Sequence, residues 1–319
     1  MNIFNAIPAA LLFALTMQPV KTHRNPAPEK EQADTLNGNP LFSFGIIADA
    51  QYSDIPPAGS RYYRSSLAKL QDAVDTFKAS APDFAVNLGD IIDMDFKSYN
   101  PAMKILESSG LRIFHVTGNH DYSVEPEYID SLPVKSPDFG NYYSLIYRHF
   151  RLLFLDGNEI SVYSSGKLSD KLYGEKYLDS LKRAGAINAV AWNGGIGKDQ
   201  ISWIRKEIEE AEVHSEKVLI FCHFPVYPDG THNLLNCNEM VNTVSGYLNV
   251  IAWFSGHYHA GNYARLRQIH FLTFEGMVET PDSNSFAIVK VFTDRLEVRG
   301  FGREKSRILN LESSLRFNR

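Results

Sequence analysis

Short apolar runs that end in polar clusters recur along the chain from Leu41 onward. Each run has the length and composition of a buried strand, and each stops at a cluster that contains Asp, Asn or His. The five runs and the residues that follow them are Leu41 to Ala48 with Asp49-Ala50-Gln51, Phe84 to Leu88 with Gly89-Asp90, Arg112 to Thr117 with Gly118-Asn119-His120, Val218 to Cys222 with His223, and Val250 to Ser255 with Gly256-His257-Tyr258-His259. Strands of this kind deliver site residues to one sheet edge, so we expect the chemistry at their tips.

Two segments between these runs have the spacing of amphipathic helices. The segment from Ser60 to Ala79 places apolar residues three or four positions apart, with Ser60 in the N-cap position and Pro82 beyond the end. Lys198 to Val213 repeats the pattern before the run that ends at His223. We therefore expect crossover helices between neighbouring strands.

After Gly261 the pattern changes to strands joined by short turns, with runs at Ile269 to Phe274, Phe286 to Phe292 and Leu296 to Phe301. Alternating strands and helices followed by strands alone predict an α/β sandwich of sheets flanked by helices. The sequence has no internal repeat and no interior break long enough for a domain boundary. We therefore expect a single domain over residues 41–319.

The first 40 residues differ from the rest. Ile7 to Met17 is apolar and short enough for the core of a signal peptide, but a basic n-region and a clean cleavage site are missing. Residues 21–40 are polar and rich in Pro, Asn, Glu and Lys, which predicts a disordered linker. We therefore expect residues 1–40 to be an apolar segment, possible as a signal peptide, followed by a linker. A cytoplasmic location is favoured over export. No stable membrane association is expected.

Composition limits the partners. The 319 residues are 44% hydrophobic and 22% charged, as in ordinary globular proteins. A formal charge of -5 and the lack of a basic stripe argue against nucleic acid as substrate. Cys222 and Cys237 are too few for a disulfide scaffold and form no CxxC pair. The oligomeric state stays open.

The polar clusters share one type of donor atom. Together they offer only oxygen and imidazole nitrogen, a set that suits a pair of manganese, iron or zinc ions rather than thiophilic metals. The residues in question are Asp49, Asp90, Asn119, His223, His257 and His259. Asp90 follows a glycine, which lets the backbone approach closely, and it is the natural carboxylate to bridge two ions. Two aspartates and two divalent cations leave a formal charge near +2, which suits a phosphate or diphosphate.

These clusters resemble the five-block pattern of the calcineurin-like metallophosphoesterases, in order, from Leu41 to His259. The matching blocks are Asp49-x-Gln51, Gly89-Asp90-x-x-Asp93, Gly118-Asn119-His120-Asp121, His223 and Gly256-His257-x-His259. Most members carry His where this chain has Gln51, and Asp49-Ala50-Gln51-Tyr52 is similar to the manganese-dependent ADP-ribose/CDP-alcohol diphosphatases. Further similarity lies in Arg61-Tyr62-Tyr63-Arg64, Trp192-Asn193-Gly194-Gly195, His223-x-Pro225-x-Tyr227-Pro228 and the run from Glu275 to Phe286.

The resemblance implies a calcineurin-like α/β sandwich, with two central mixed β-sheets flanked by α-helices, and a centre of two divalent ions, manganese in preference to iron or zinc. Asp49, Asp90 and His259 would hold one ion, with Gln51 as a weaker ligand or in the outer shell. Asp90, Asn119, His223 and His257 would hold the other. Whether Gln51 binds directly or only packs under the site stays open.

The resemblance also implies a catalytic pair. His120 would donate a proton to the leaving oxygen or stabilise its charge, with Asp93 orienting the imidazole and Asp121 as the rival orienting group. Gly194 and Gly195 could approach a phosphate, although plain turn chemistry is favoured.

The function implied is hydrolysis of a nucleotide-linked diphosphate, such as ADP-ribose or a CDP-alcohol, by attack of metal-bound hydroxide. A general phosphodiesterase or phosphomonoesterase is the alternative enzyme, and a non-catalytic metal-binding module is the alternative of another class. Ser/Thr protein phosphatases carry an Arg shortly after Asp93 of this block, where this chain has Met94-Asp95. No cofactor beyond the metals is expected, and Tyr52 or Tyr227 could stack on a base.

Overall fold

The computed structural model describes residues 38–135, 140–164 and 167–311. The apolar segment and linker predicted for residues 1–40 therefore lie outside the described residues, apart from positions 38–40. Across the described ranges, no helix has the length and apolar character needed to cross a membrane.

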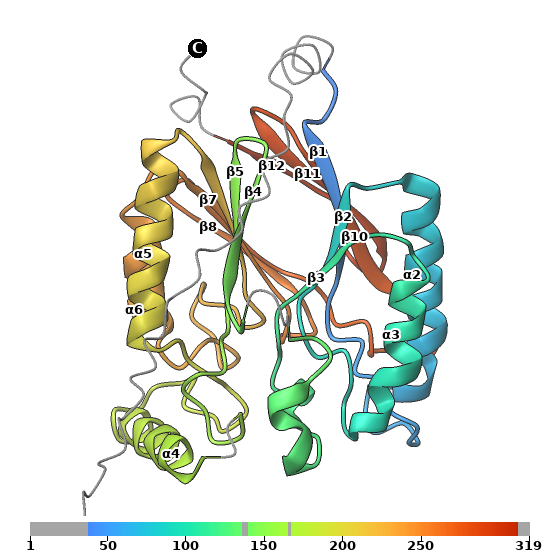
Figure 1. The fold of residues 1–319 in the computed structure, drawn as a ribbon, viewed down its shortest axis with the longest axis vertical. Helices are drawn as coiled ribbons and strands as arrows, with labels where there is room; N and C mark the ends of the chain where they lie inside the picture. Colours follow the sequence, from blue (N-terminus) through green and yellow to red (C-terminus); the bar gives the residue numbers. More distant parts are fainter. Residues whose placement is uncertain (1–37, 136–139, 165–166, 312–319) are drawn as a thin grey trace, which may run out of the picture.

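Two six-stranded sheets form the centre of the molecule (Figure 1). The first sheet has the strand order β12-β11-β10-β1-β2-β3, in which β1, β2 and β3 are parallel and the other neighbours are antiparallel. Its strands are β1 (Phe42–Ile47), β2 (Phe84–Asn87), β3 (Ile113–His115), β10 (Ser285–Val291), β11 (Arg295–Gly302) and β12 (Arg307–Asn310).

The second sheet has the order β4-β5-β6-β7-β9-β8. The middle strands β5, β6, β7 and β9 are parallel, whereas β4 and β8 close the edges as antiparallel partners. Its strands are β4 (Tyr143–Tyr147), β5 (Phe150–Phe154), β6 (Lys217–Phe221), β7 (Val250–Ser255), β8 (Asn262–Leu266) and β9 (Ile269–Thr273).

Aromatic side chains join the two sheets. The ring of Phe44 in β1 stacks on Phe84 at 5.3 Å and meets the edge of Phe221 in β6 at 5.6 Å. All three are within the buried cluster between the sheets. Aromatic pairs of this kind add about 0.5–1.5 kcal/mol each to the energy of burial, so this layer fixes the sheets against each other.

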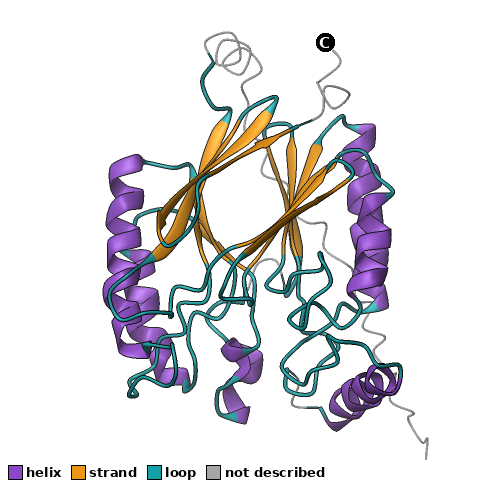
Figure 2. Cartoon of the chain, turned by 180° about the vertical axis from the view of Figure 1, so that it is seen from behind, coloured by secondary structure: helices purple, strands orange, loops and turns teal. Residues whose placement is uncertain are grey.

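Helices cover the outer faces of both sheets, as Figure 2 shows from behind. On the first sheet lie α2 (Ser66–Ser80) and α3 (Tyr99–Glu107), and on the second lie α5 (Lys198–Val213) and α6 (Cys237–Ser245). Helix α4 (Leu168–Arg183) lies near the end of the sandwich where the loops gather. Short 3₁₀-helices occur at η1 (Tyr63–Ser65), η2 (Phe96–Ser98), η3 (His120–Tyr122) and η4 (Pro126–Ser131).

The predicted sandwich of two mixed sheets flanked by helices is confirmed, and the eight predicted strands are present within about two residues of their expected ends. The strands after Gly261 do not form one meander, because β9 lies in the second sheet and β10 in the first. The β4–β5 hairpin was not predicted. Its strands lie on both sides of Arg148, which takes a positive φ of 54° at the turn.

The predicted helix start at Ser60 is wrong, because α2 begins at Ser66. The backbone before it is already paired elsewhere: Arg61 forms a bridge with Glu279, and the Tyr62 N–H donates to the carbonyl of Val278. The loop after β9 therefore takes the hydrogen bonds that a first helical turn would need.

Lys69 ties helix α2 to this loop. The side chain is only 5% exposed, and its ammonium donates to the carbonyl oxygens of Met277, Glu279 and Thr280 at 2.7–2.8 Å. Burial lowers the pKa of Lys69 to about 8. Three carbonyls that would otherwise be unpaired are thus satisfied by one side chain from a neighbouring layer.

Replacing Lys69 tests this anchor. Lys69→Met keeps the aliphatic length but leaves these carbonyls without a donor, so we expect the free energy of unfolding to fall by roughly 2–4 kcal/mol. The measurement is urea unfolding monitored by circular dichroism. Lys78→Met, on the exposed face of the same helix, is the matched control and should change stability by less than about 0.5 kcal/mol. Equal effects of both variants would contradict the anchor.

Candidate metal centre

The loops that follow the parallel strands meet at one end of the sandwich, the lower end in Figures 1 and 2. All nine predicted site residues lie on these loops. Asp49 and Gln51 follow β1, Asp90 and Asp93 follow β2, Asn119 and His120 follow β3, His223 follows β6, and His257 and His259 follow β7. Both sheets therefore contribute, because the carboxyl ends of β1, β2 and β3 face those of β6 and β7.

The backbone at these positions is unusual. Four predicted ligand residues have positive φ, with values of 52° at Asp49, 44° at Gln51, 54° at Asp90 and 67° at His257. Residues other than glycine seldom adopt this conformation, which costs about 1–3 kcal/mol where it is held by the surroundings. Hydrogen bonds between the loops hold it, among them Asp49 N–H to Gly89 O and Gln51 N–H to Asp90 O.

Two glycines allow the loops to approach each other. A Cβ on Gly89, whose φ is +97°, would lie 2.6 Å from the Gly118 nitrogen and 2.7 Å from Nδ1 of His223. A Cβ on Gly118 would collide with the Asp90 carboxylate. Any larger residue at either position would thus displace a predicted ligand.

The first group of donor atoms is Asp90, His223 and His257. One ligand atom from each residue lies within 4.8 Å of the other two. Nε2 of His223 is 3.3 Å from Asp90 Oδ2 and 3.2 Å from Nδ1 of His257. Within the described part of the chain, this buried trio is the cluster of histidine and acidic groups with the geometry to hold a metal ion.

Outer partners fix which ring nitrogens face inward. The other nitrogen of His223, Nδ1, donates to the carbonyl of Leu88 at 2.8 Å, and Nε2 of His257 donates to Asn193 Oδ1 at 2.9 Å. The remaining nitrogens therefore point their lone pairs at one another. A positive charge has to lie between them, either a proton or a metal cation.

The electrostatics agree with this geometry. Burial lowers the pKa of His223, but the Asp90 carboxylate outweighs burial and raises it to about 9. Burial and the neighbouring His223 hold the pKa of His257 well below its usual value. Burial raises the pKa of Asp90, but His223 and His120 together hold it well below its usual range. Asp90 is therefore ionised, and the trio attracts a cation.

The second group is Asp49, Gln51 and His259. Nε2 of His259 lies 3.4 Å from Asp49 Oδ1. The amide nitrogen of Gln51 is 3.4 Å from that same imidazole nitrogen and 3.2 Å from Asp90 Oδ2. Gln51 thus reaches into the centre and connects the two groups through Asp90.

Unpaired amide oxygens support metal binding at both groups. Gln51 Oε1 and Asn119 Oδ1 are buried and have no hydrogen-bond partner. Buried polar atoms without a partner are rare and need an explanation, of which an ion is one. Carboxylate and amide oxygens with imidazole nitrogens also form a donor set that suits manganese, iron or zinc. The residues present therefore fit two divalent cations.

His120 lies at the edge of this centre. Its Nδ1 is 3.0 Å from Asp93 Oδ1, and its backbone N–H donates to Asp90 Oδ1 at 2.7 Å. Burial lowers the pKa of His120, but Asp90 and Asp93 outweigh burial and raise it. Asp93 therefore lies where the resemblance places the group that orients His120.

Asp121, the rival orienting residue, makes other contacts. Its carboxylate accepts backbone N–H groups from Asp90 at 2.9 Å, Ile91 at 3.1 Å and Gly118 at 2.8 Å. Burial, followed by the charge of Asp90, raises the pKa of Asp121 to about 6. Asp121 thus joins the loop after β2 to the loop after β3.

Sequence reasoning assigned no role to three further residues at the centre. Asn193 accepts from His257, and Glu279 lies 2.7 Å from His259 Nδ1 and fixes that ring. Arg61 lies 3.9 Å from Asp93. Its charge only partly opposes the carboxylates that raise the pKa of His120 and of His259. All three lie in the additional blocks of similarity around Arg61, Trp192 and Glu275. Those blocks are the sequence signal that could have pointed to them.

An open cavity of about 540 Å³ lies over the centre. Its lining combines predicted ligands with basic and aromatic side chains. The residues are Gln51, Ser60, Arg61, Asp90, Asn119, His120, Trp192, His232, His257, Tyr258, His259, Ala260 and Glu279. Gly194 and Gly195 do not line it, since the space beside them is taken by Gly157 and Asn236.

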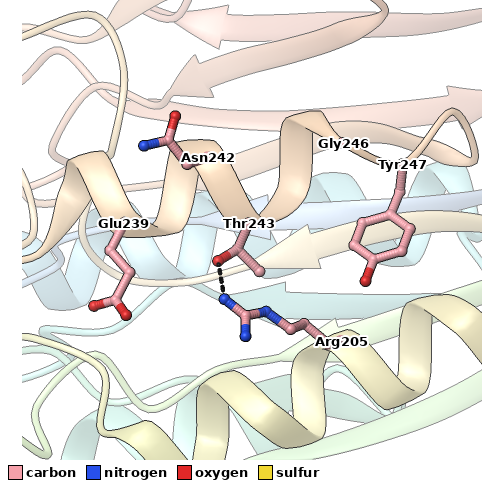
Figure 3. A pocket seen from close by; sticks show the side chains of 6 residues that line it. All are labelled: Arg205, Glu239, Asn242, Thr243, Gly246 and Tyr247. Carbon is pink, nitrogen blue, oxygen red and sulfur yellow. Dashed lines mark hydrogen bonds between the residues drawn. The ribbon is translucent and has the colours of Figure 1, made fainter.

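A second hollow of about 640 Å³ lies between helices α5 and α6, on the outer face of the second sheet (Figure 3). Arg205 there donates to the Thr243 hydroxyl at 3.3 Å, and Glu239 and Tyr247 lie at its margins. It contains none of the predicted site residues, so the chemistry belongs to the cavity at the strand ends.

Comparisons with known proteins agree with this architecture. The calcineurin-like phosphoesterase family model matches residues 42–261. A human protein named manganese-dependent ADP-ribose/CDP-alcohol diphosphatase is 29% identical, with 87% of this chain and 95% of that protein covered. A rice protein of the same name is 31% identical, with 82% and 91% covered.

A solved structure shows the same fold. The crystal structure of a dimetal phosphatase from Danio rerio is similar with a TM-score of 0.77 at 26% identity, covering 86% of this chain and 100% of that one. The family model matches well over half of the 319 residues and ends two residues beyond His259, so it includes every predicted ligand and His120. The chain belongs to the calcineurin-like phosphoesterase family.

Proposed function

We propose that this protein is a manganese-dependent hydrolase that splits the diphosphate of nucleotide-linked compounds such as ADP-ribose or a CDP-alcohol. The observation that carries the proposal is the pair of donor groups joined at Asp90, with Arg61 beside them in one cavity. The names of the human and rice relatives support the choice of metal and substrate.

Each donor group would hold one cation. Asp49, Gln51, Asp90 and His259 form one ligand set, and Asp90, Asn119, His223 and His257 form the other. When bound, two divalent cations supply an ionised water as nucleophile at neutral pH and neutralise charge on phosphate oxygens. Asn193 and Glu279 hold the ligand rings of His257 and His259 in the orientation this requires.

Arg61 favours a diphosphate over a monophosphate. Its side chain is 35% exposed and lines the same cavity as His120 and His259. A guanidinium binds phosphate oxygens through parallel N–H groups. A second phosphate next to the centre would meet this cation, whereas a monoester would leave it unused.

His120 supplies the proton to the leaving group. During hydrolysis a new P–O bond forms to the water oxygen, and the bond from phosphorus to the bridging oxygen breaks. Because Nδ1 faces Asp93, Nε2 of His120 is the atom that can donate a proton to that oxygen. Asp93 stabilises the protonated ring.

Metal removal tests the centre. We expect chelation to abolish hydrolysis and Mn²⁺ to restore it better than Mg²⁺, because Mg²⁺ prefers an all-oxygen shell that includes several waters and this centre offers three imidazoles. Activity and bound metal are measured in the same samples. Full activity in metal-stripped protein would contradict the proposal.

Substitution separates the ligands from the proton donor. His120→Ala should lower kcat by roughly 10²–10⁴-fold with metal content unchanged, because it removes only proton transfer. Asp90→Ala should lose metal as well, since both groups share this carboxylate. His214→Ala, an exposed histidine at the end of α5, is the control. Equal metal loss in His120→Ala and Asp90→Ala would refute this division of roles.

A substrate panel with Mn²⁺ tests the bond that is broken. ADP-ribose should yield AMP and ribose 5-phosphate, CDP-choline should yield CMP and phosphocholine, and ¹⁸O from water should enter one phosphate product. Anhydrides should react faster than simple monoesters because a phosphate ester is the better leaving group. If monoesters react well and every nucleotide-linked diphosphate is inert, the protein is a monoesterase of the same family.

A further inference from the structure

Three aromatic side chains stand at the rim of the cavity over the metal centre. Trp192 is 49% exposed and Tyr258 is 37% exposed, although both are large rings. His232 lies between them, with ring centroids 6.5 Å from Trp192 and 4.9 Å from Tyr258, and both pairs are tilted by 38°. We call these three residues the aromatic rim. Because the rings are tilted and partly exposed, ring surface is open to a ligand.

The rim is held in a fixed position relative to the metal centre. Asn193, next to Trp192, donates through Nδ2 to the carbonyls of Asn188 and Thr231, and Thr231 precedes His232. The same amide accepts from His257 at 2.9 Å. One buried side chain therefore fixes the loops that carry Trp192 and His232 to a predicted ligand.

The rim is also close to the reacting bond. The rings of His232 and His257 are 5.5 Å apart, and the rim lines the same cavity as Asp90 and His120. A group on the rim would lie within one substrate length of the diphosphate.

A third, smaller cavity of about 170 Å³ opens next to the rim and shares His232 and Tyr258 with it. Its lining includes the polar residues Asp229, Thr231, Asn233, Asn262 and Thr273. A flat stacking surface beside hydrogen-bonding groups fits a heterocycle, which has both a π-face and a polar edge. A quaternary ammonium group would use the rings and the charge of Asp229, but it has no donor or acceptor for the neutral polar groups of the cavity.

We infer that the aromatic rim of Trp192, His232 and Tyr258 is the subsite that receives the nucleobase of the substrate. The inference rests on the proposed function and deepens it, because it places the nucleotide half of the substrate on one side of the metal centre. Trp192 provides the largest open ring and contributes most to stacking.

Equilibrium binding tests the rim without relying on turnover. The Kd values of AMP, ribose 5-phosphate and phosphocholine are measured by calorimetry on the manganese-loaded protein and its variants. Trp192→Ala should weaken the binding of AMP by roughly 5-fold to 100-fold, which is the loss expected from one base stack. It should change the Kd of ribose 5-phosphate by less than about 2-fold. Trp192→Phe should restore most of the AMP affinity.

Controls and outcomes separate this inference from the proposed function. Tyr173→Ala, which removes an exposed ring from α4, should leave all three affinities unchanged. Equal weakening of AMP and ribose 5-phosphate, or no effect on AMP, would overturn the base subsite. Selective weakening of phosphocholine would overturn it too and assign the rim to the alcohol. Failure of the wild type to hydrolyse any nucleotide-linked diphosphate contradicts the proposed function, whereas the AMP measurement still decides the rim.

Discussion

The structure at the carboxyl ends of the strands depends on one constraint, which is the repulsion between the acceptor atoms of Asp90, His223 and His257. Asp90 Oδ2 and Nδ1 of His257 both lie within 3.3 Å of Nε2 of His223, in a buried place. These atoms attract a cation strongly but repel one another without one. The surrounding protein must therefore hold them, which it does through Leu88, Asn193 and the backbone amides that bind Asp121.

The sandwich offsets the cost of this arrangement. Positive φ angles at Asp49, Gln51, Asp90 and His257 are unfavourable one by one, and tight turns directly after strands impose them. The strands themselves are stabilised by the aromatic layer between the sheets and by helices on both outer faces. Stability is thus concentrated in the sheets, and strain is concentrated where the ligands are needed.

Asn193 connects chemistry with recognition. Its carbonyl oxygen orients His257, while its amide group holds the loops of Trp192 and His232. Movement of the aromatic rim would therefore disturb the predicted ligand His257, and movement of His257 would disturb the rim. Under the proposed function, such coupling would let the binding of one end of a substrate place its diphosphate accurately at the centre.

Eight of the strands, the order of the ligand blocks and the type of donor atom could be predicted from the sequence, because these depend on local apolar runs and on residue identity. The sequence assigned no role to Asn193, Glu279 or Arg61, since an amide or a charge in a loop has no local pattern that reveals its partner. It also placed the start of α2 at Ser60, where local capping signals are overridden by pairing with residues 278–280. Only the tertiary structure could decide these points, because the contacts join residues such as Asn193 and His257 that are 64 positions apart. The sequence thus predicts the metal-binding residues, and the fold decides what orients them and what lies beside them.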